Sequence, residues 1–260
     1  MTINEYKTSG AYHAELKLPR QWLPRYFRRL HVAEEILFKH MPRDACIADI
    51  GGGEGVLVRR LVERGFSQVF GLDRYAPFLG SGMIRGSILR LPFGRAMFDA
   101  VTCLDVLEHI PLHLQSQACG ELARVLKPQG VALVSVPNMA HFKSRMRLLV
   151  MGEPWRNSLE KHPGELSAGE RIKVLHEAGL TLVDSVGLHL TLSYDPRPRG
   201  CLGRLLSRIM FSPNVPSGLC WTVLFLLHKG PRPLWVEAGH RPLKKALASY
   251  RPMPEDPTGQ

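Results

Sequence analysis

The sequence lacks a long apolar run, an obvious disulfide framework and any internal repeat. Its longest late apolar run, residues 218–227, is far shorter than the roughly 20 residues that a membrane-spanning helix needs. Residues 1–18 are polar and have no apolar core of the kind found in a secretory signal, so we expect no signal peptide. These absences predict a cytoplasmic protein, with peripheral membrane contact as an open alternative.

Cysteine is also scarce. The five cysteines are odd in number and do not cluster in the sequence: Cys46, Cys103, Cys119, Cys201 and Cys220. Apolar neighbours surround several of them. We therefore expect small buried hydrophobic residues in a reducing compartment, and neither disulfides nor a cysteine metal site.

Acidic residues are outnumbered, with 23 Asp and Glu against 34 Lys and Arg, which gives a formal net charge of +11. The basic residues group as Arg25, Arg28 and Arg29; Lys143, Arg145 and Arg147; Arg197, Arg199, Arg204 and Arg208; and Lys244 and Lys245. A basic surface is either simply solvated or binds an anionic membrane or nucleic acid. Residues 202–211 interleave arginines with large apolar side chains, which favours an interfacial helix. Nucleic acid ranks lower, because no RNA-binding module is recognisable.

A glycine-rich turn is the strongest positive signal. The run Asp49-Ile50-Gly51-Gly52-Gly53-Glu54-Gly55 joins an apolar strand (45–50) to a helix (54–64). Glycines let the backbone approach a ligand closely, and the helix start offers unpaired N–H groups. A dinucleotide fold would place a third glycine where this chain has Val56. The turn therefore predicts a nucleotide site, with a nicotinamide or nucleotide-sugar oxidoreductase as an alternative.

A second apolar strand (68–73) ends in Asp73, about 20 residues after the glycine turn. At that spacing a carboxylate accepts hydrogen bonds from the two ribose hydroxyls of a nucleotide. The sequence then continues with Leu91-Pro92-Phe93, Phe98-Asp99-Ala100-Val101, Leu107-Glu108-His109 and Leu126-Lys127-Pro128-Gln129-Gly130.

In order and spacing these pieces, over residues 45–138, resemble the class I S-adenosylmethionine-dependent methyltransferases. The resemblance is to the type 11/type 23 branch, which includes the ubiquinone-biosynthesis and methionine-biosynthesis-associated enzymes. It implies a transferase that uses S-adenosylmethionine as methyl donor.

Strand patterns alternate with amphipathic helical patterns at 26–41, 111–126 and 167–178, which predicts an α/β fold with a mostly parallel sheet. Ser167 and Glu170 form a candidate capping box. The resemblance implies a Rossmann-like, seven-stranded sheet with helices on both faces and an antiparallel last strand, here 221–229.

We expect three parts of the chain. Residues 1–44 form an N-terminal cap or substrate segment with the first helix. Residues 45–229 form the donor-binding domain, with insertions at 138–166 and 189–219 that are expected to set the acceptor. Residues 230–260 form a basic, proline-containing tail that we expect to be loose.

The resemblance assigns a set of residues to the donor: Asp49, Gly51, Gly52, Gly53, Gly55, Asp73, Arg74, Ser87, Ile88 and Asp105. Asp49 and the glycine amides would hold the methionine end, and Asp73 the ribose. The chain departs from the family after Gly86, where Ser87 and Ile88 stand in place of the acid that commonly contacts the adenine amino group.

Asp105, Glu108, His109 and His162 resemble the E-x-x-E-H…H set that binds a divalent metal in some O-methyltransferases, with Asp105 one methylene shorter than the usual Glu. Three hypotheses stay open: a metal site, a general base at His109 or His162, or a merely structural pair. The expected acceptor is a small or lipid-like molecule, with a hydroxyl as the methylated group. An RNA-directed methyltransferase and a non-catalytic donor-binding accessory protein are the alternatives.

Overall fold

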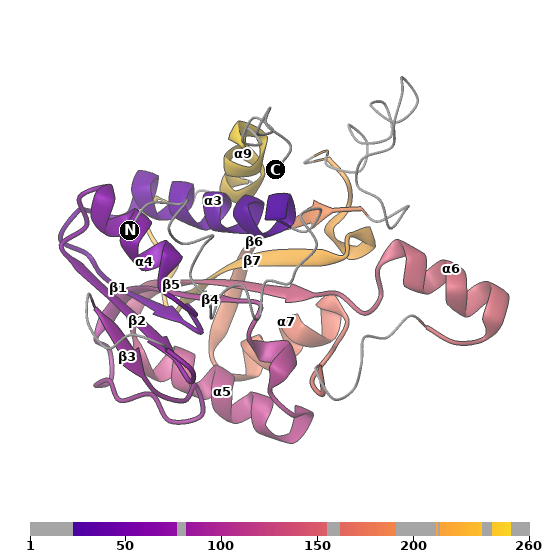
Figure 1. The fold of residues 1–260 in the computed structure, drawn as a ribbon, viewed down its shortest axis with the longest axis horizontal. Helices are drawn as coiled ribbons and strands as arrows, with labels where there is room; N and C mark the ends of the chain where they lie inside the picture. The colour runs from indigo at the N-terminus through magenta and orange to yellow at the C-terminus, as the bar shows by residue number, and fades with distance from the viewer. Residues whose placement is uncertain are drawn as a thin grey trace, which may run out of the picture.

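The computed structural model describes residues 23–76, 82–154, 162–190, 212, 214–235 and 241–250. They form a seven-stranded sheet in the order β3-β2-β1-β4-β5-β7-β6 (Figure 1). The strands are β1 (Cys46–Ile50), β2 (Gln68–Asp73), β3 (Met83–Arg85), β4 (Phe98–Leu104), β5 (Leu126–Pro137), β6 (Leu180–His189) and β7 (Thr222–Lys229). Neighbouring strands are parallel except at β7, which runs antiparallel to both β5 and β6. The predicted Rossmann-like sheet is confirmed.

Helices cover both faces of the sheet (Figure 1). One face carries α3 (Leu23–His40), α4 (Val56–Glu63) and α9 (Pro242–Ser249), and the other carries α5 (Leu112–Val125) and α7 (Ala168–Glu177). Two short 3-10 turns, η2 (Leu107–His109) and η3 (Ser217–Leu219), lie between elements. Helix α6 (Phe142–Met151) is ten residues long and projects from the sheet edge at which β5 ends.

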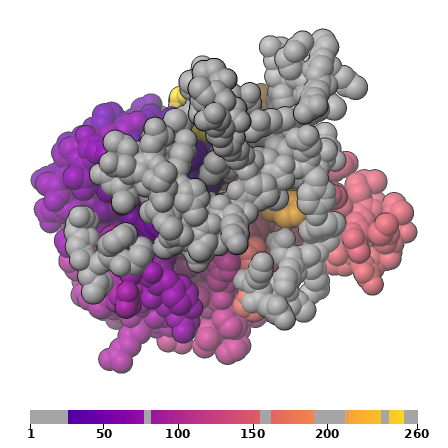
Figure 2. All heavy atoms as spheres, viewed as in Figure 1, coloured from indigo at the N-terminus to yellow at the C-terminus, as the bar shows by residue number. Residues whose placement is uncertain are grey.

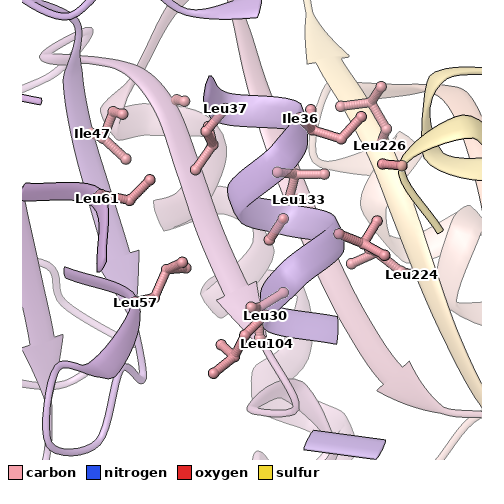
Figure 3. Close-up of a cluster of buried hydrophobic side chains, with 14 of the residues drawn as sticks. Leu30, Ile36, Leu37, Ile47, Leu57, Leu61, Leu104, Leu133, Leu224 and Leu226 are labelled. Carbon is pink, nitrogen blue, oxygen red and sulfur yellow. The ribbon is translucent and has the colours of Figure 1, made fainter. Parts of the chain in front are cut away.

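Side chains that alternate along the central strands build the two cores. In β5, Leu133 faces α3, whereas its neighbours Ala132 and Val134 face α5 and α7. Figure 3 shows Ile36 of α3 beside Leu226 of β7 in the first core. Because both faces of the sheet are covered, the central strands are apolar on both sides.

The predicted capping box of α7 is confirmed. The Ser167 hydroxyl accepts from the Glu170 amide at 3.3 Å, and the Glu170 carboxylate accepts from the Ser167 amide at 2.9 Å. Gly179 follows in the left-handed region, at φ +87°, where the helix gives way to β6. The capping box and Gly179 thus mark where α7 begins and ends.

The prediction of a loose tail after Gly230 is wrong for residues 242–249. Helix α9 packs on α3 and β6, with Leu243 and Leu247 fully buried. Asp184 of β6 accepts a hydrogen bond from the Leu243 amide at 3.1 Å and one from Arg241 Nε at 2.7 Å. The buried carboxylate thus caps the start of this helix.

The prediction that Arg28 and Arg29 belong to a basic surface is also wrong. Arg28 is 5% exposed, and burial lowers the pKa of its guanidinium to about 10. Arg29 points to the end of β4, as described below. The segment 202–211, the arginines from Arg197 to Arg208 and the Arg25 side chain lie outside the described residues.

Cys46, Cys103, Cys119 and Cys220 are free thiols, and all four are buried, as predicted for small hydrophobic residues. Cys201 lies outside the described residues. Burial raises the pKa of the Cys103 thiol well above its usual value. In the part of the chain that is described, no helix has the length and apolar character to cross a membrane.

Candidate active site

The glycine turn follows β1 and leads into α4, at the carboxyl edge of the sheet. Gly51, Gly53 and Gly55 all have positive φ, at +80°, +57° and +74°. A Cβ on Gly51 would lie 2.2 Å from Val106 Cγ2, and one on Gly52 would lie 2.5 Å from Asp49 Oδ2. A Cβ on Gly53 would meet nothing within 4 Å. Close packing therefore explains why Gly51 and Gly52 are glycines, whereas Gly53 faces open space.

Asp73, the last residue of β2, lies next to that open space. Its Oδ2 accepts a hydrogen bond from the Gly53 amide at 2.9 Å, and its Oδ1 accepts from the Tyr75 amide at 2.8 Å. Each carboxylate oxygen has a second lone pair for a ligand hydroxyl. The side chain of Arg74 points to solvent and lies over the Tyr75 ring, with 5.7 Å between its Cζ and the ring centroid.

Asp49 is buried at the end of β1. Thr102 of β4 donates a hydrogen bond to its Oδ1 at 2.6 Å. Burial raises the pKa of Asp49 to about 6, and the nearby charge of Asp73 adds to the shift. No ion pair to Asp49 occurs among the described residues. A cationic ligand group beside this carboxylate would favour its ionised form.

Asp105 follows β4 in the left-handed region, at φ +54°. Its carboxylate accepts hydrogen bonds from Arg29 of α3 and, at 2.5 Å, from the Ser135 hydroxyl of β5. Burial opposes the charge on Arg29, but Asp105 and the other acidic groups around it raise the pKa of Arg29 above its usual value. The sequence predicted Asp105 as a site residue, and it missed Arg29.

Glu108 lies in η2 and is 2% exposed. Burial raises its pKa well above the usual value, and the charge of Asp105 adds to the shift. Its Oε2 has no hydrogen-bond partner in the described part of the chain. The carboxyl group therefore favours its neutral form.

The structure brings His109 and His162 together. Their rings meet edge to face, with 4.8 Å between centroids. His162 Nδ1 lies 3.1 Å from Glu165 Oε1, a partner that the sequence prediction missed. A carboxylate on one ring nitrogen fixes the tautomer of a histidine and leaves the other nitrogen to accept a proton.

The metal hypothesis for Asp105, Glu108, His109 and His162 is not supported. Among the described residues, no three His, Cys, Asp or Glu side chains are arranged to hold a metal ion. The physical reason is that Arg29, a fixed cation, already holds Asp105, and that burial favours a neutral Glu108.

Gly86, Ser87 and Ile88 lie after β3. The Gly86 amide donates to the Asp73 carbonyl at 3.1 Å, which joins this turn to the end of β2. The Ser87 hydroxyl accepts from the Leu89 amide at 3.3 Å, and Ile88 is buried among core residues.

Two buried polar side chains, also missed from the sequence, join the segment of His162 to η2. Arg171 of α7 is 1% exposed and donates to Gln115 Oε1 at 2.7 Å and to the Gly164 carbonyl at 3.0 Å. Gln115 Nε2 donates to the carbonyls of Gly164 at 2.7 Å and Leu107 at 2.9 Å. The signal in the sequence was a pair of polar residues at buried positions of amphipathic helices.

The part of the chain that holds the glycine turn matches a known protein family. Residues 48–134, which run from β1 into β5, match the model of a family described as "Methyltransferase domain". The chain contains a methyltransferase domain. The glycine turn, Asp73 and η2 all lie within the residues that match.

Two relatives are similar to the methyltransferase domain and its flanks. One, in Mycolicibacterium smegmatis, is named "Probable S-adenosylmethionine-dependent methyltransferase" and is 29% identical over 171 residues, 63% of this chain and 62% of the relative. The other, a ubiquinone biosynthesis O-methyltransferase of Azoarcus sp., is 28% identical over 168 residues, 58% of this chain and 68% of the relative. The chain thus spans somewhat under two thirds of the first relative's length.

A solved structure shares the fold. The 1,6-didemethyltoxoflavin-N1-methyltransferase of Burkholderia thailandensis, with 1,6-didemethyltoxoflavin and S-adenosylhomocysteine bound, has a TM-score of 0.56 at 19% identity. The match covers 89% of this chain and 92% of that one.

Proposed function

We propose that this chain transfers a methyl group from S-adenosylmethionine to a small or lipid-like acceptor, at a hydroxyl. The observation that carries the proposal is the open face of Gly53, whose amide donates to the Asp73 carboxylate. The buried carboxylate of Asp49 lies against the neighbouring Gly52. A glycine that packing does not require, next to two carboxylates, fits a ligand that approaches the backbone and carries hydroxyls and a positive charge.

The donor, when bound, supplies an electrophilic methyl group on a sulfonium. Asp73 would accept from the two ribose hydroxyls, and Asp49 would face the ammonium of the methionine part. The amides of the glycine turn and the start of α4 supply further donors. Because methyl transfer is an in-line displacement, the main task of these residues is to hold the donor in one orientation.

A hydroxyl acceptor must also lose a proton. Two histidines are the candidate bases. His162 lies in the segment before α7 and is oriented by Glu165, and His109 lies beside it on η2. Support for a hydroxyl comes from relatives that are named ubiquinone biosynthesis O-methyltransferases. The toxoflavin-precursor enzyme is named an N-methyltransferase, so the fold by itself does not select the methylated atom.

Calorimetry with S-adenosylmethionine and S-adenosylhomocysteine tests the donor site. We expect micromolar binding of both, or roughly 8 kcal/mol. Asp73→Ala should weaken both ligands alike, because they share the ribose. Asp44→Ala, at an exposed aspartate, is the matched control and should bind as the wild type does. Absence of both a binding heat and a thermal shift in the wild type would overturn the proposal.

Turnover with labelled donor separates the remaining hypotheses. Small-molecule, quinone and lipid extracts should yield a labelled product. A label that appears only in RNA would favour an RNA-directed enzyme, an alternative that the net charge of +11 supports. Tight donor binding with no labelled product in any extract would favour an accessory protein.

A further inference from the structure

Helix α6 is held firmly at its base. His141, which caps it, is buried, and its Nδ1 accepts from the Ser144 amide at 3.3 Å. Asn138, just before, donates to the carbonyls of Gly218 at 3.1 Å and Cys220 at 3.0 Å, and accepts from the Ala168 amide at 3.0 Å. The start of α6 is therefore fixed to both η3 and α7.

The far end of α6 is apolar and exposed. The exposed fractions are 43% for Met146, 49% for Leu148, 79% for Leu149, 75% for Val150 and 65% for Met151. Four of these residues are consecutive, so the last turn is apolar on every side. Figure 2 shows α6, in salmon, extending beyond the rest of the coloured atoms. We call residues 148–151 the α6 tip. Exposing a contiguous apolar surface to water is unfavourable. Exposed apolar patches of this kind mark interaction sites.

Basic side chains lie behind the tip. Lys143, Arg145 and Arg147 belong to the first six residues of α6, and Glu153 is the acidic residue that follows the tip, 3.8 Å from Arg147. At 1.5 Å per residue, Leu149 lies about 6 Å beyond Arg145 along the helix axis. Interfacial helices bury apolar side chains by about 5–10 Å while cations stay among the headgroups. The spacing in α6 fits that arrangement.

We propose that the α6 tip inserts into the interface of an anionic lipid membrane, with Lys143, Arg145 and Arg147 among the phosphate headgroups. Charge selects this occupant: the chain carries a net +11, so an anionic bilayer attracts it, whereas a second copy repels it. The site differs from residues 202–211, on which the sequence prediction of membrane contact depended.

The position of α6 adds a consequence that rests on the proposed function. Helix α6 follows the carboxyl end of β5, and β1, β2 and β4 end at the same edge with Asp49, Asp73 and Asp105. A bilayer at the α6 tip therefore lies on the donor side of the sheet. A lipid-like acceptor would reach the site from the membrane.

Vesicle co-sedimentation tests the insertion. The wild type should bind phosphatidylglycerol-containing vesicles at low salt, bind phosphatidylcholine vesicles at least about tenfold more weakly, and lose binding as salt rises. Leu149→Glu/Val150→Glu should lower binding by at least about tenfold. The matched control is Val62→Glu/Leu112→Glu, which removes two apolar side chains, each 53% exposed, from α4 and α5 with the same change of charge. It should lower binding by no more than about threefold.

A donor-induced thermal shift of equal size in all variants would show that they fold, and it keeps this test separate from that of the donor site. Leu149→Trp should shift its emission to the blue on vesicles and be quenched by lipids with brominated acyl chains. Equal vesicle binding by the tip variant and its control would overturn the proposal. So would a wild-type dimer in sedimentation velocity that the tip variant loses, because the tip would then meet a second copy.

Discussion

Arg29 of α3 donates a hydrogen bond to the carboxylate of Asp105, 76 residues further along the chain. Ser135 of β5 donates to the other oxygen of that carboxylate. One side chain at the end of β4 thus joins α3, β4 and β5 at the carboxyl edge of the sheet. The backbone of Asp105, at φ +54°, is one that Asp and Asn adopt more readily than most residues.

Asp105→Asn should therefore test the ion pair with little change in backbone preference. The exposed fractions are 18% for Arg29 and 20% for Asp105, so water screens the pair weakly. Loss of one partner from a fully buried pair costs about 3–5 kcal/mol. With this partial exposure we expect the free energy of unfolding to fall by about 2 kcal/mol, measured by urea denaturation.

Asp44→Asn, at an exposed aspartate, is the control for the loss of one charge. Arg29→Met and the double variant complete a double-mutant cycle, which isolates the coupling between the two side chains. A coupling energy near zero would mean that the pair does not hold α3 to the edge of the sheet.

The glycine turn allows stability and donor binding to be separated. Gly51→Ala should lower the free energy of unfolding by about 3 kcal/mol, because its φ is +80° and its Cβ would lie 2.2 Å from Val106 Cγ2. Gly53→Ala meets no atom within 4 Å and should cost only about 1 kcal/mol, the strain of its positive φ. If the donor lies against Gly53, the same variant should lose donor affinity at least about tenfold.

Thermal unfolding and calorimetry on both variants check this prediction. The Gly51→Ala/Val106→Ala double variant should be more stable than the sum of the two single changes, because it removes the close contact. Wild-type donor affinity in Gly53→Ala would place the donor elsewhere than on this turn.

The sequence predicted most of the fold because the signals are local. Strand residues 45–50 and 68–73 are apolar runs of strand length, and Ser167 with Glu170 lie at capping-box spacing. Helix α9 was missed because its signal is a short stripe of Leu243, Ala246 and Leu247 within a proline-containing segment, and its partner Asp184 is 59 residues away from Leu243.

The candidate site could be predicted only where the spacing of residues along the chain indicates it. Asp49, the glycines and Asp73 follow from spacing along two adjacent strands. Arg29 was assigned to a basic surface because composition shows a charge but not the carboxylate it meets after folding. Glu165 went unnoticed because its relation to His162 depends on the backbone path around Gly164, where a Cβ would come within 2.0 Å of the Ile110 carbonyl.

Donor binding should depend on pH through Asp49. The pKa of Asp49 is raised by burial from 3.8 to about 6, so about nine tenths of the carboxyl groups are protonated at pH 5. If the ammonium of the ligand needs the carboxylate, affinity for S-adenosylmethionine and S-adenosylhomocysteine should fall about tenfold between pH 7.5 and pH 5. Calorimetry across this range measures the change.

In the absence of ligand, the effect of Asp49 on the free energy of unfolding changes with pH in the opposite direction to its effect on donor affinity. Because the pKa of Asp49 is higher in the folded than in the unfolded chain, the folded chain holds the extra proton between about pH 4 and pH 6, and this group lowers stability as the pH rises through that range. Asp49→Asn should remove both the pH dependence of donor affinity and this part of the pH dependence of unfolding. Unchanged profiles in Asp49→Asn would assign them to another group.

The hydrogen bond between His162 and Glu165 leads to a prediction about the proton on the histidine. With Glu165 Oε1 3.1 Å from Nδ1, the neutral ring should carry its proton on Nδ1, which leaves Nε2 to accept the proton of an acceptor hydroxyl. The 15N shifts of the His162 ring at alkaline pH report the tautomer directly. They require neither donor nor acceptor.

Two variants separate the hydrogen bond from the charge. Glu165→Gln keeps an acceptor oxygen and should keep the tautomer, whereas Glu165→Leu should lose it and lower kcat at least about tenfold without changing the donor Kd. Glu63→Leu, at an exposed glutamate of α4, is the control for the loss of one carboxylate and should leave the ring shifts unchanged. The tautomer decides which ring nitrogen can accept a proton. If the wild-type His162 ring carries its proton on Nε2, His162 with Glu165 cannot be the base, even if Glu165→Leu has a low kcat.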